Sequence, residues 1–212
     1  MKVLDITVPI EVYYNTNESD KIIRLSKELV ETDLFKSDEI KIIGVGKLLK
    51  SKGFDRMVKI INKLVGERYP VHLYILGEGP LRKELEQYIK ENKLYDYVTL
   101  LGYQTNPYKY VAKSDLFICA SHAEGFSTAT TEALIVGTPV CTVEVAGMKE
   151  MLGENNEYGV IVENSEEKLY EGIKKLISNP ELLQMYKQKA IERGKEFSTE
   201  KTVQAVEKMF LE

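Results

Sequence analysis

The most informative part of the sequence is Ser121–Gly137, which reads Ser-His-Ala-Glu-Gly-Phe-Ser-Thr-Ala-Thr-Thr-Glu-Ala-Leu-Ile-Val-Gly. Apolar, strand-like segments lie on both sides of it. Between these segments we expect a loop that holds Glu124–Phe126 and a short helix that opens at Ser127 or Thr128. Gly137 is well placed to end this helix. The stretch therefore predicts a strand, a loop, a helix and a second strand.

The expected start of this helix suits a bound anion. Ser and Thr side chains gather there beside free backbone N–H groups and the positive end of the helix dipole. Glu124 and Glu132 lie in the loop and in the helix, with seven residues between them. Carboxylates accept hydrogen bonds from sugar hydroxyls, so the pattern suits a ligand that carries phosphates and hydroxyls. From these residues alone, it is equally open that both acids merely favour a helix N-terminus.

Composition narrows the class of protein. The 212 residues carry a formal net charge of −4, which argues against a nucleic-acid-binding protein. Cys119 and Cys141 each lie in an apolar run and predict buried free thiols of a reducing compartment. No His, Cys and Asp cluster has the spacing of metal ligands, so no metal is predicted. Without a signal peptide or an apolar run near 18 residues, we expect a cytoplasmic chain, and peripheral association with the inner membrane face stays open.

From residue 40 onward, apolar runs alternate with amphipathic stretches. The runs are rich in Val, Ile and Leu, as expected of strands that are covered on both faces. The alternation predicts an α/β fold, a Rossmann-like, doubly wound sheet of six parallel strands with C-terminal helices. The predicted strands are 40–45, 71–76, 97–101, 116–120, 140–145 and 159–162. The predicted helices are 54–65, 81–91, 107–112, 128–136, 148–152, 166–178, 180–195 and 199–211. Upstream, we expect a strand at 11–15 and a helix at 21–30.

The topology itself brings charged loops together. If the strands take the common order 3-2-1-4-5-6, the switch point lies between the first and the fourth strand, where such sheets bind ligands. The loop after the first strand carries Lys47 and Lys52, and the loop after the fourth carries Glu124. We therefore expect both lysines to lie near the Glu124–Glu132 turn. Taken in isolation, the lysines fit a solvated loop better.

Several motifs then resemble one family. The two acids, the Gly-Phe after the first and Gly137-Thr138-Pro139 resemble the Glu-x7-Glu signature of retaining glycosyltransferases of family 4. Enzymes of this family have the GT-B fold, with two Rossmann-like domains and the active site between them. The resemblance covers roughly residues 11–212. Three further segments fit the family pattern: Gly46-Lys47-Leu48-x3-Lys52-Gly53, Gly77-Glu78-Gly79-Pro80 and Leu100-Leu101-Gly102-Tyr103.

The resemblance implies roles for individual residues. Glu124 would contact the donor sugar, and Lys47 and Lys52 would hold the diphosphate as catalytic cations. Lys47 stands where the family usually has Arg, which removes bidentate geometry. Glu132 would hydrogen-bond the ribose hydroxyls. The remaining donor-binding residues would be Gly125, Phe126, Ser127, Thr128, Gly46, Gly102, Tyr103 and His122.

The resemblance also implies a domain plan and a reaction. Residues 1–40 would join a nucleotide-sugar-binding domain at 41–212, and the N-terminal acceptor domain would be absent. We therefore expect a chain that binds a nucleotide-diphosphate sugar without metal or cofactor and turns over weakly by itself. The acceptor would be a sugar or a lipid-linked saccharide of a bacterial surface polysaccharide or glycolipid. A nucleotide-sugar epimerase of the same fold and a non-catalytic partner subunit remain open alternatives.

Overall fold

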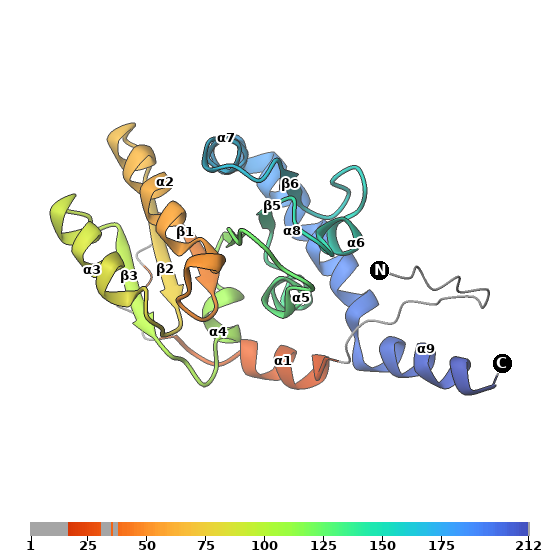
Figure 1. Ribbon diagram of the computed structural model, residues 1–212. Helices are drawn as coiled ribbons and strands as arrows, with labels where there is room; N and C mark the ends of the chain where they lie inside the picture. The colour runs from red at the N-terminus through yellow and green to blue at the C-terminus, as the bar shows by residue number, and fades with distance from the viewer. Residues whose placement is uncertain (1–16, 31–34, 36–37, 212) are drawn as a thin grey trace, which may run out of the picture.

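The computed structural model describes residues 17–30, 35 and 38–211, so the strand predicted at 11–15 lies outside the described residues. Within these ranges, six strands form one parallel sheet in the order β3-β2-β1-β4-β5-β6 (Figure 1). The predicted fold class is confirmed, and the strand order is the common one on which the expected switch point depended. The strands are β1 (Ile40–Val45), β2 (Val71–Leu76), β3 (Val98–Gly102), β4 (Leu116–Cys119), β5 (Val140–Val143) and β6 (Val160–Val162).

Helix α1 precedes the first strand, helices α2 to α6 connect consecutive strands, and α7 to α9 follow the last strand. The short 3-10 turn η2 (Lys50–Lys52) precedes α2, and η3 (Lys195–Phe197) precedes α9. The helices are α1 (Ser19–Ser26), α2 (Phe54–Gly66), α3 (Arg82–Glu91), α4 (Tyr108–Val111), α5 (Thr128–Ile135), α6 (Met148–Leu152), α7 (Glu166–Ile177), α8 (Pro180–Gly194) and α9 (Thr199–Leu211).

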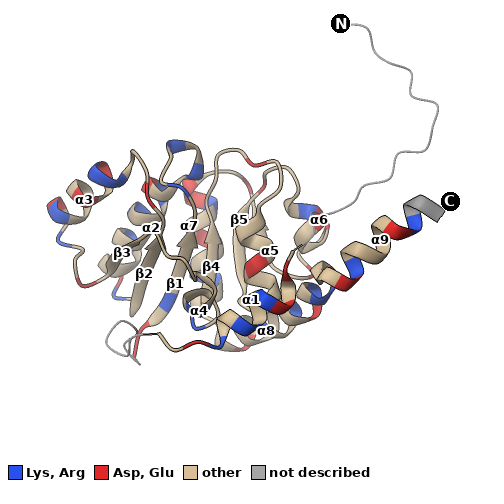
Figure 2. Ribbon diagram, turned by 90° about the horizontal axis from the view of Figure 1, so that it is seen from below, with Lys and Arg blue, Asp and Glu red and all other residues tan. Residues whose placement is uncertain are grey.

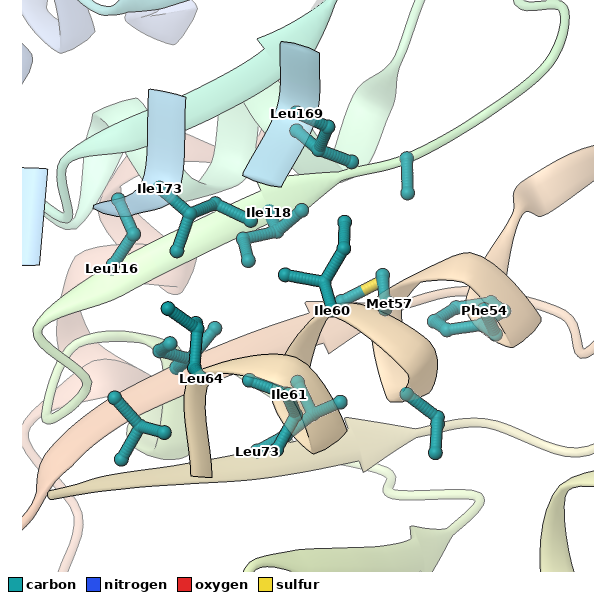
Figure 3. Packing of buried hydrophobic residues seen from close by; sticks show 14 of the residues in the cluster. Phe54, Met57, Ile60, Ile61, Leu64, Leu73, Leu116, Ile118, Leu169 and Ile173 are labelled. Carbon is teal, nitrogen blue, oxygen red and sulfur yellow. The ribbon is translucent and has the colours of Figure 1, made fainter. Parts of the chain in front are cut away.

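The sheet separates two hydrophobic cores. Successive strand residues point to opposite faces, so Ile42 belongs to one core and Ile43 to the other. Helices α2, α3 and α7 cover the first face, and α4, α5 and α6 cover the second (Figure 1). Figure 3 shows the first core, where Met57 and Ile60 of α2 and Ile173 of α7 pack over the strands. Because both faces are covered, the strands consist of nearly unbroken apolar residues.

Helix α5 follows the prediction at both ends. The Ser127 side chain accepts a hydrogen bond from the backbone N–H of Thr130, as a helix N-cap does. Gly137 follows the last turn with φ of 80°, a left-handed conformation that favours glycine. Its N–H donates to the carbonyl oxygen of Leu134, which completes the C-terminal cap.

The helix predicted at 21–30 is wrong in its bounds, because α1 ends at Ser26. The Ser26 hydroxyl donates to the carbonyl oxygen of Ile23, and Lys27 N–H donates to Arg24 in a tighter turn. Leu29, which lies beyond the end of α1, is 85% exposed. The predicted strand at 140–145 is also too long, because its pairing with β6 ends at Val143.

Other sequence predictions concern buried side chains and the surface. Cys119 and Cys141 are buried free thiols, as predicted. The buried His72 stacks on Tyr74 and forms a hydrogen bond with Thr99. Figure 2 shows Lys and Arg interspersed with Asp and Glu along α3 and α9. Among the described residues, no helix is both long and apolar enough to span a bilayer.

Candidate functional site

A crevice with two lobes lies at the carboxyl ends of the strands, where the strand order reverses between β1 and β4. We call the cavity of about 210 Å³ over β1 and β4 the inner lobe. The cavity of about 570 Å³ over β1, β2 and β3 is the outer lobe. Val45, Gly46 and Lys47 line both, so the two lobes share one wall. The inner lobe is also lined by Lys52, Ser121, Glu124, Phe126, Ser127 and Thr128. The outer lobe is also lined by Gly77, Glu78, Tyr103, Gln104, Pro107 and Tyr108.

An ion pair occupies one side of the inner lobe. Lys52 Nζ lies 2.6 Å from Glu124 Oε1, although 72 residues separate the two in sequence. The Ser121 hydroxyl donates to the same carboxylate at 2.7 Å. The Glu124 side chain is only 10% exposed, whereas that of Lys52 is 32% exposed. The predicted convergence of these two loops is therefore present, and it produces a carboxylate that already has two partners.

Gly53 sets the position of Lys52. This glycine has φ of 68° and joins η2 to α2. A Cβ on Gly53 would lie 1.9 Å from the carbonyl oxygen of Ala120, at the end of β4. The backbone can approach β4 this closely only because no side chain intervenes. The Lys-Gly pair thus places a cation over the end of the neighbouring strand.

The hydroxyl groups at the start of α5 divide into two sets. Thr130 and Thr131 are fully buried and bond inward, Thr130 to Ser127 Oγ at 2.9 Å and Thr131 to Ser127 O at 3.3 Å. Thr128 is exposed and lines the inner lobe. Of the threonines that sequence marked as anion donors, only Thr128 therefore faces a ligand-sized space.

Glu132 is engaged with a residue that the sequence analysis did not single out. Its Oε1 accepts a hydrogen bond of 3.1 Å from the hydroxyl of Tyr108, whose ring lines the outer lobe. Burial raises the pKa of Glu132 above the ordinary 4.5, although the bond from Tyr108 acts in the opposite direction. Burial and the nearby Glu132 carboxylate raise the pKa of Tyr108 to about 12, so its hydroxyl stays protonated at neutral pH. The tyrosine directly after Pro107 could have indicated this contact, because its apolar ring can pack while its hydroxyl finds a hydrogen-bond partner.

The outer lobe carries an exposed aromatic ring. Tyr103 directly follows Gly102, the last residue of β3, and is 75% exposed. The loop below it is held locally, because Gln104 Nε2 donates to the carbonyl oxygen of Leu101 at 2.8 Å. The ring therefore projects from an anchored loop beside a large cavity, as a stacking surface would.

Some of the predicted site residues line the crevice and others do not. Lys47 is exposed and lines both lobes. Four predicted residues are not among those that line either lobe in the described part of the chain: Gly102, His122, Gly125 and Glu132. His122 contributes backbone bonds, since its N–H donates to the carbonyl oxygen of Ser51 at 2.7 Å. Their roles toward a ligand stay predictions.

Comparison with known proteins gives a family and several relatives. The family model described as glycosyl transferases group 1 matches residues 26–193. Campylobacter jejuni N-acetylgalactosamine-N,N'-diacetylbacillosaminyl-diphospho-undecaprenol 4-alpha-N-acetylgalactosaminyltransferase is 36% identical over 189 residues, which is 88% of this chain and 49% of that protein. Bacillus subtilis poly(glycerol-phosphate) alpha-glucosyltransferase is 29% identical over 163 residues, 76% of this chain and 24% of that protein. The chain spans about half or less of the length of these curated relatives.

Solved structures share the fold. Anabaena HepE, in a complex with UDP and glucose, superposes with a TM-score of 0.79 at 19% identity, over 94% of this chain and 56% of that chain. Staphylococcus aureus TarM, in a complex that includes UDP and alpha-GlcNAc-glycerol, superposes with a TM-score of 0.73 at 23% identity. This match covers 86% of the present chain and 38% of the TarM chain. These likenesses establish the Rossmann-like fold seen in GT-B glycosyltransferases.

Proposed function

The chain belongs to the glycosyl transferases group 1 family, and we propose that it is the donor-binding part of a retaining glycosyltransferase of family 4. Its ligand would be a nucleotide-diphosphate sugar bound in the two-lobed crevice. The observation that carries this proposal is the pairing of Lys52 with Glu124 at the switch point of the sheet, with Lys47 on the shared wall. The UDP in the HepE and TarM complexes supports the same ligand class.

The inner lobe would hold the diphosphate and the sugar. Lys52, Lys47 and the start of α5 at Thr128 offer two cations, a hydroxyl and helix N-terminal N–H groups around one space. As the bond to the sugar breaks, negative charge grows on the leaving diphosphate, and fixed cations stabilise it most at that moment. Glu124 holds Lys52 before the donor arrives and would accept a hydrogen bond from a sugar hydroxyl.

The outer lobe would hold the nucleoside. Tyr103 offers an exposed ring for the base, at the end of the loop that follows β3. Glu132 would accept hydrogen bonds from the ribose hydroxyls, for which its ionised form offers both carboxylate oxygens. Since Tyr108 already donates to Glu132, the ribose would share that carboxylate with the tyrosine or displace it. Backbone groups near Gly102, and the loop at His122 and Gly125, would complete the contacts.

The names of two relatives support a substrate class. Both are named for transfer of alpha-linked hexosyl groups, to an undecaprenol-linked saccharide and to poly(glycerol-phosphate). We therefore propose hexosyl transfer to a glycolipid or a surface polymer. An alpha product retains configuration if the donor sugar is alpha-linked to its diphosphate, which supports the retaining assignment.

Donor binding and acceptor binding would lie on different domains. Residues 41–212 would form the nucleotide-sugar unit, and the acceptor would bind on the second half that the family resemblance implies. By itself, this 212-residue stretch should bind the donor and transfer sugar weakly. The family resemblance is also the reason to propose that no metal or cofactor takes part.

Calorimetric titration with UDP, GDP and ADP, and then with their sugars, tests the proposal. We expect saturable binding of one diphosphate and at least several-fold weaker binding in Glu132→Ala. Glu181→Ala is the matched control, because Glu181 is an exposed carboxylate in the first turn of another helix, α8. A folded chain that binds none of the three diphosphates would contradict the proposal and favour a non-catalytic partner subunit.

A further inference from the structure

Arg56 is a buried arginine directly behind the inner lobe. It lies on α2, one turn after Gly53, and is only 4% exposed. Its Nε donates to the carbonyl oxygen of Ala120 at 2.6 Å, and its Nη2 donates to that of Ser121 at 2.8 Å. The third hydrogen bond, from Nη1, goes to Asn164 Oδ1 at 2.9 Å. One guanidinium therefore joins the end of β4 to the segment before α7.

Asn164 continues this network by one residue. Its Nδ2 donates to the carbonyl oxygen of His122 at 3.2 Å. The carbonyl groups of Ala120, Ser121 and His122 are thus all engaged by the Arg56–Asn164 pair. The next residues along the chain lead directly to Glu124, so the pair fixes the loop that carries the inner-lobe carboxylate.

The buried guanidinium of Arg56 donates its hydrogen bonds to neutral groups. Burying a cation is costly unless a carboxylate or several acceptors compensate it. All three hydrogen-bond acceptors of Arg56 are neutral oxygens, while Asp55 and Glu166 act on it only through space. In the described part of the chain, no carboxylate accepts a hydrogen bond from Arg56. An anion in the inner lobe would therefore add a favourable electrostatic interaction with its buried charge.

Building on the proposed function, we propose that Arg56, together with Asn164, is a positioning residue for the donor diphosphate. The pair keeps three carbonyl dipoles bound outside the inner lobe and holds the Lys52–Glu124 pair in place before the ligand binds. The buried positive charge of Arg56 adds to the attraction for the phosphates. Arg56 itself does not touch the ligand, since it is not among the residues that line the inner lobe.

A purely structural role makes a different prediction. If Arg56 only held α2 to β4, its loss would lower stability and weaken every ligand to the same degree. A positioning role predicts a selective loss of affinity for the diphosphate, with little change for the matching nucleoside. The nucleoside should bind in the outer lobe, which Arg56 does not contact.

The experiment compares Arg56→Lys and Asn164→Ala with Lys59→Gln. Lysine keeps the charge but cannot span three acceptors, and Asn164→Ala removes one arm of the network. Lys59 is the control, because it lies on the same helix with its side chain 46% exposed. Affinity is measured by calorimetry for whichever of UDP, GDP or ADP the parent chain binds, and by competition for the matching nucleoside. Circular dichroism and thermal unfolding establish that each variant is folded.

We expect Arg56→Lys to lose about tenfold in diphosphate affinity and Asn164→Ala several-fold, with less than about twofold change for the nucleoside. Lys59→Gln should change neither. Equal weakening of both ligands, or an unchanged diphosphate affinity in folded Arg56→Lys, would overturn the inference.

A second measurement needs no ligand. Amide hydrogen exchange at residues 121–124 should become about tenfold faster in Arg56→Lys, while exchange in β1 and β2 stays unchanged. Unchanged exchange at 121–124 would show that Arg56 does not fix the loop. If the parent chain bound no diphosphate, the proposed function would fail, and this measurement would still decide whether Arg56 positions the loop.

Discussion

The two lobes of the crevice share one wall but are built differently. In the inner lobe, Glu124 is nearly buried and already bonded to Lys52 and Ser121, and Arg56 holds the loop from behind. In the outer lobe, the most prominent group is the exposed ring of Tyr103. The inner lobe is a set of charges held in place before a ligand arrives, whereas the outer lobe is an open surface.

This difference matches what each part of the proposed ligand requires. A diphosphate gains most from cations whose positions are already set, because little reorganisation is then needed on binding. A base gains mainly from contact with a ring, which tolerates small changes in geometry. Substitutions in the inner lobe should therefore alter both folding and binding, whereas substitution of the exposed Tyr103 in the outer lobe should alter binding alone.

The largest effect on folding should come from Gly53→Ala. The new Cβ would lie 1.9 Å from the Ala120 carbonyl oxygen, at a φ of 68° that side chains disfavour. We expect a loss of about 3 kcal/mol in the free energy of unfolding, measured by urea denaturation. Gly66→Ala is the control at the other end of α2, with open space at its Cβ, and should gain about 0.5–1 kcal/mol. Equal stability of the two variants would mean that α2 is not seated on β4 as described.

Lys52→Met should have the next largest effect. It leaves the nearly buried Glu124 without its cation and should cost about 1–2 kcal/mol, less than a fully buried pair because Lys52 is partly exposed. Adding Glu124→Gln should restore most of that stability without restoring diphosphate affinity. Denaturation measures the stability of the two variants, and calorimetry measures their diphosphate affinity. Recovery of affinity in the double variant would show that Lys52 does not contact phosphate.

Glu132→Gln should change the pH dependence of stability. Burial raises the Glu132 pKa above 4.5 in the folded protein, so the folded state binds more protons than the unfolded chain between the two values. Stability should therefore fall as pH rises through that window, and the fall should vanish in Glu132→Gln. Tyr108→Phe removes the bond that lowers this pKa, costs about 1 kcal/mol at neutral pH and should extend the window upward. Thermal unfolding between pH 4 and 7 is measured for the parent chain, Glu132→Gln and Tyr108→Phe. Parallel curves of stability against pH would refute the raised pKa of Glu132.

Tyr103→Ala should have the smallest effect on folding. A ring that is 75% exposed contributes little, so stability should stay within about 0.5 kcal/mol of the parent chain. Nucleotide binding should weaken by about 0.5–1.5 kcal/mol if the ring contacts the base. Tyr95→Ala is the control, because Tyr95 is 62% exposed and does not line the crevice. Calorimetry that finds both variants equal to the parent chain would exclude Tyr103 from the site.

Sequence analysis predicted the architecture well, for a physical reason. Each strand is covered on both faces, so apolar runs such as 40–45 and 71–76 are directly visible, and both bounds agree with the structure. The caps of α5 were also visible, because Ser127 and Gly137 act on backbone groups only a few residues away. The bounds predicted for the helix at 21–30 were wrong because local apolarity does not reveal which residues another element covers.

From sequence alone, the strands and the two charged loops could be identified, since periodicity and loop placement are local properties. The common strand order then placed those loops side by side. The pairs of groups that meet at the switch point depend on how the whole chain packs. Glu124 with Lys52, Glu132 with Tyr108, and Arg56 with Ala120 are separated by 24 to 72 residues, and no local pattern encodes their contacts. Such pairs form because packing of the helices on both faces of the sheet sets where side chains can reach. The motif therefore identified the family, and the packing determined the charges that a ligand would meet.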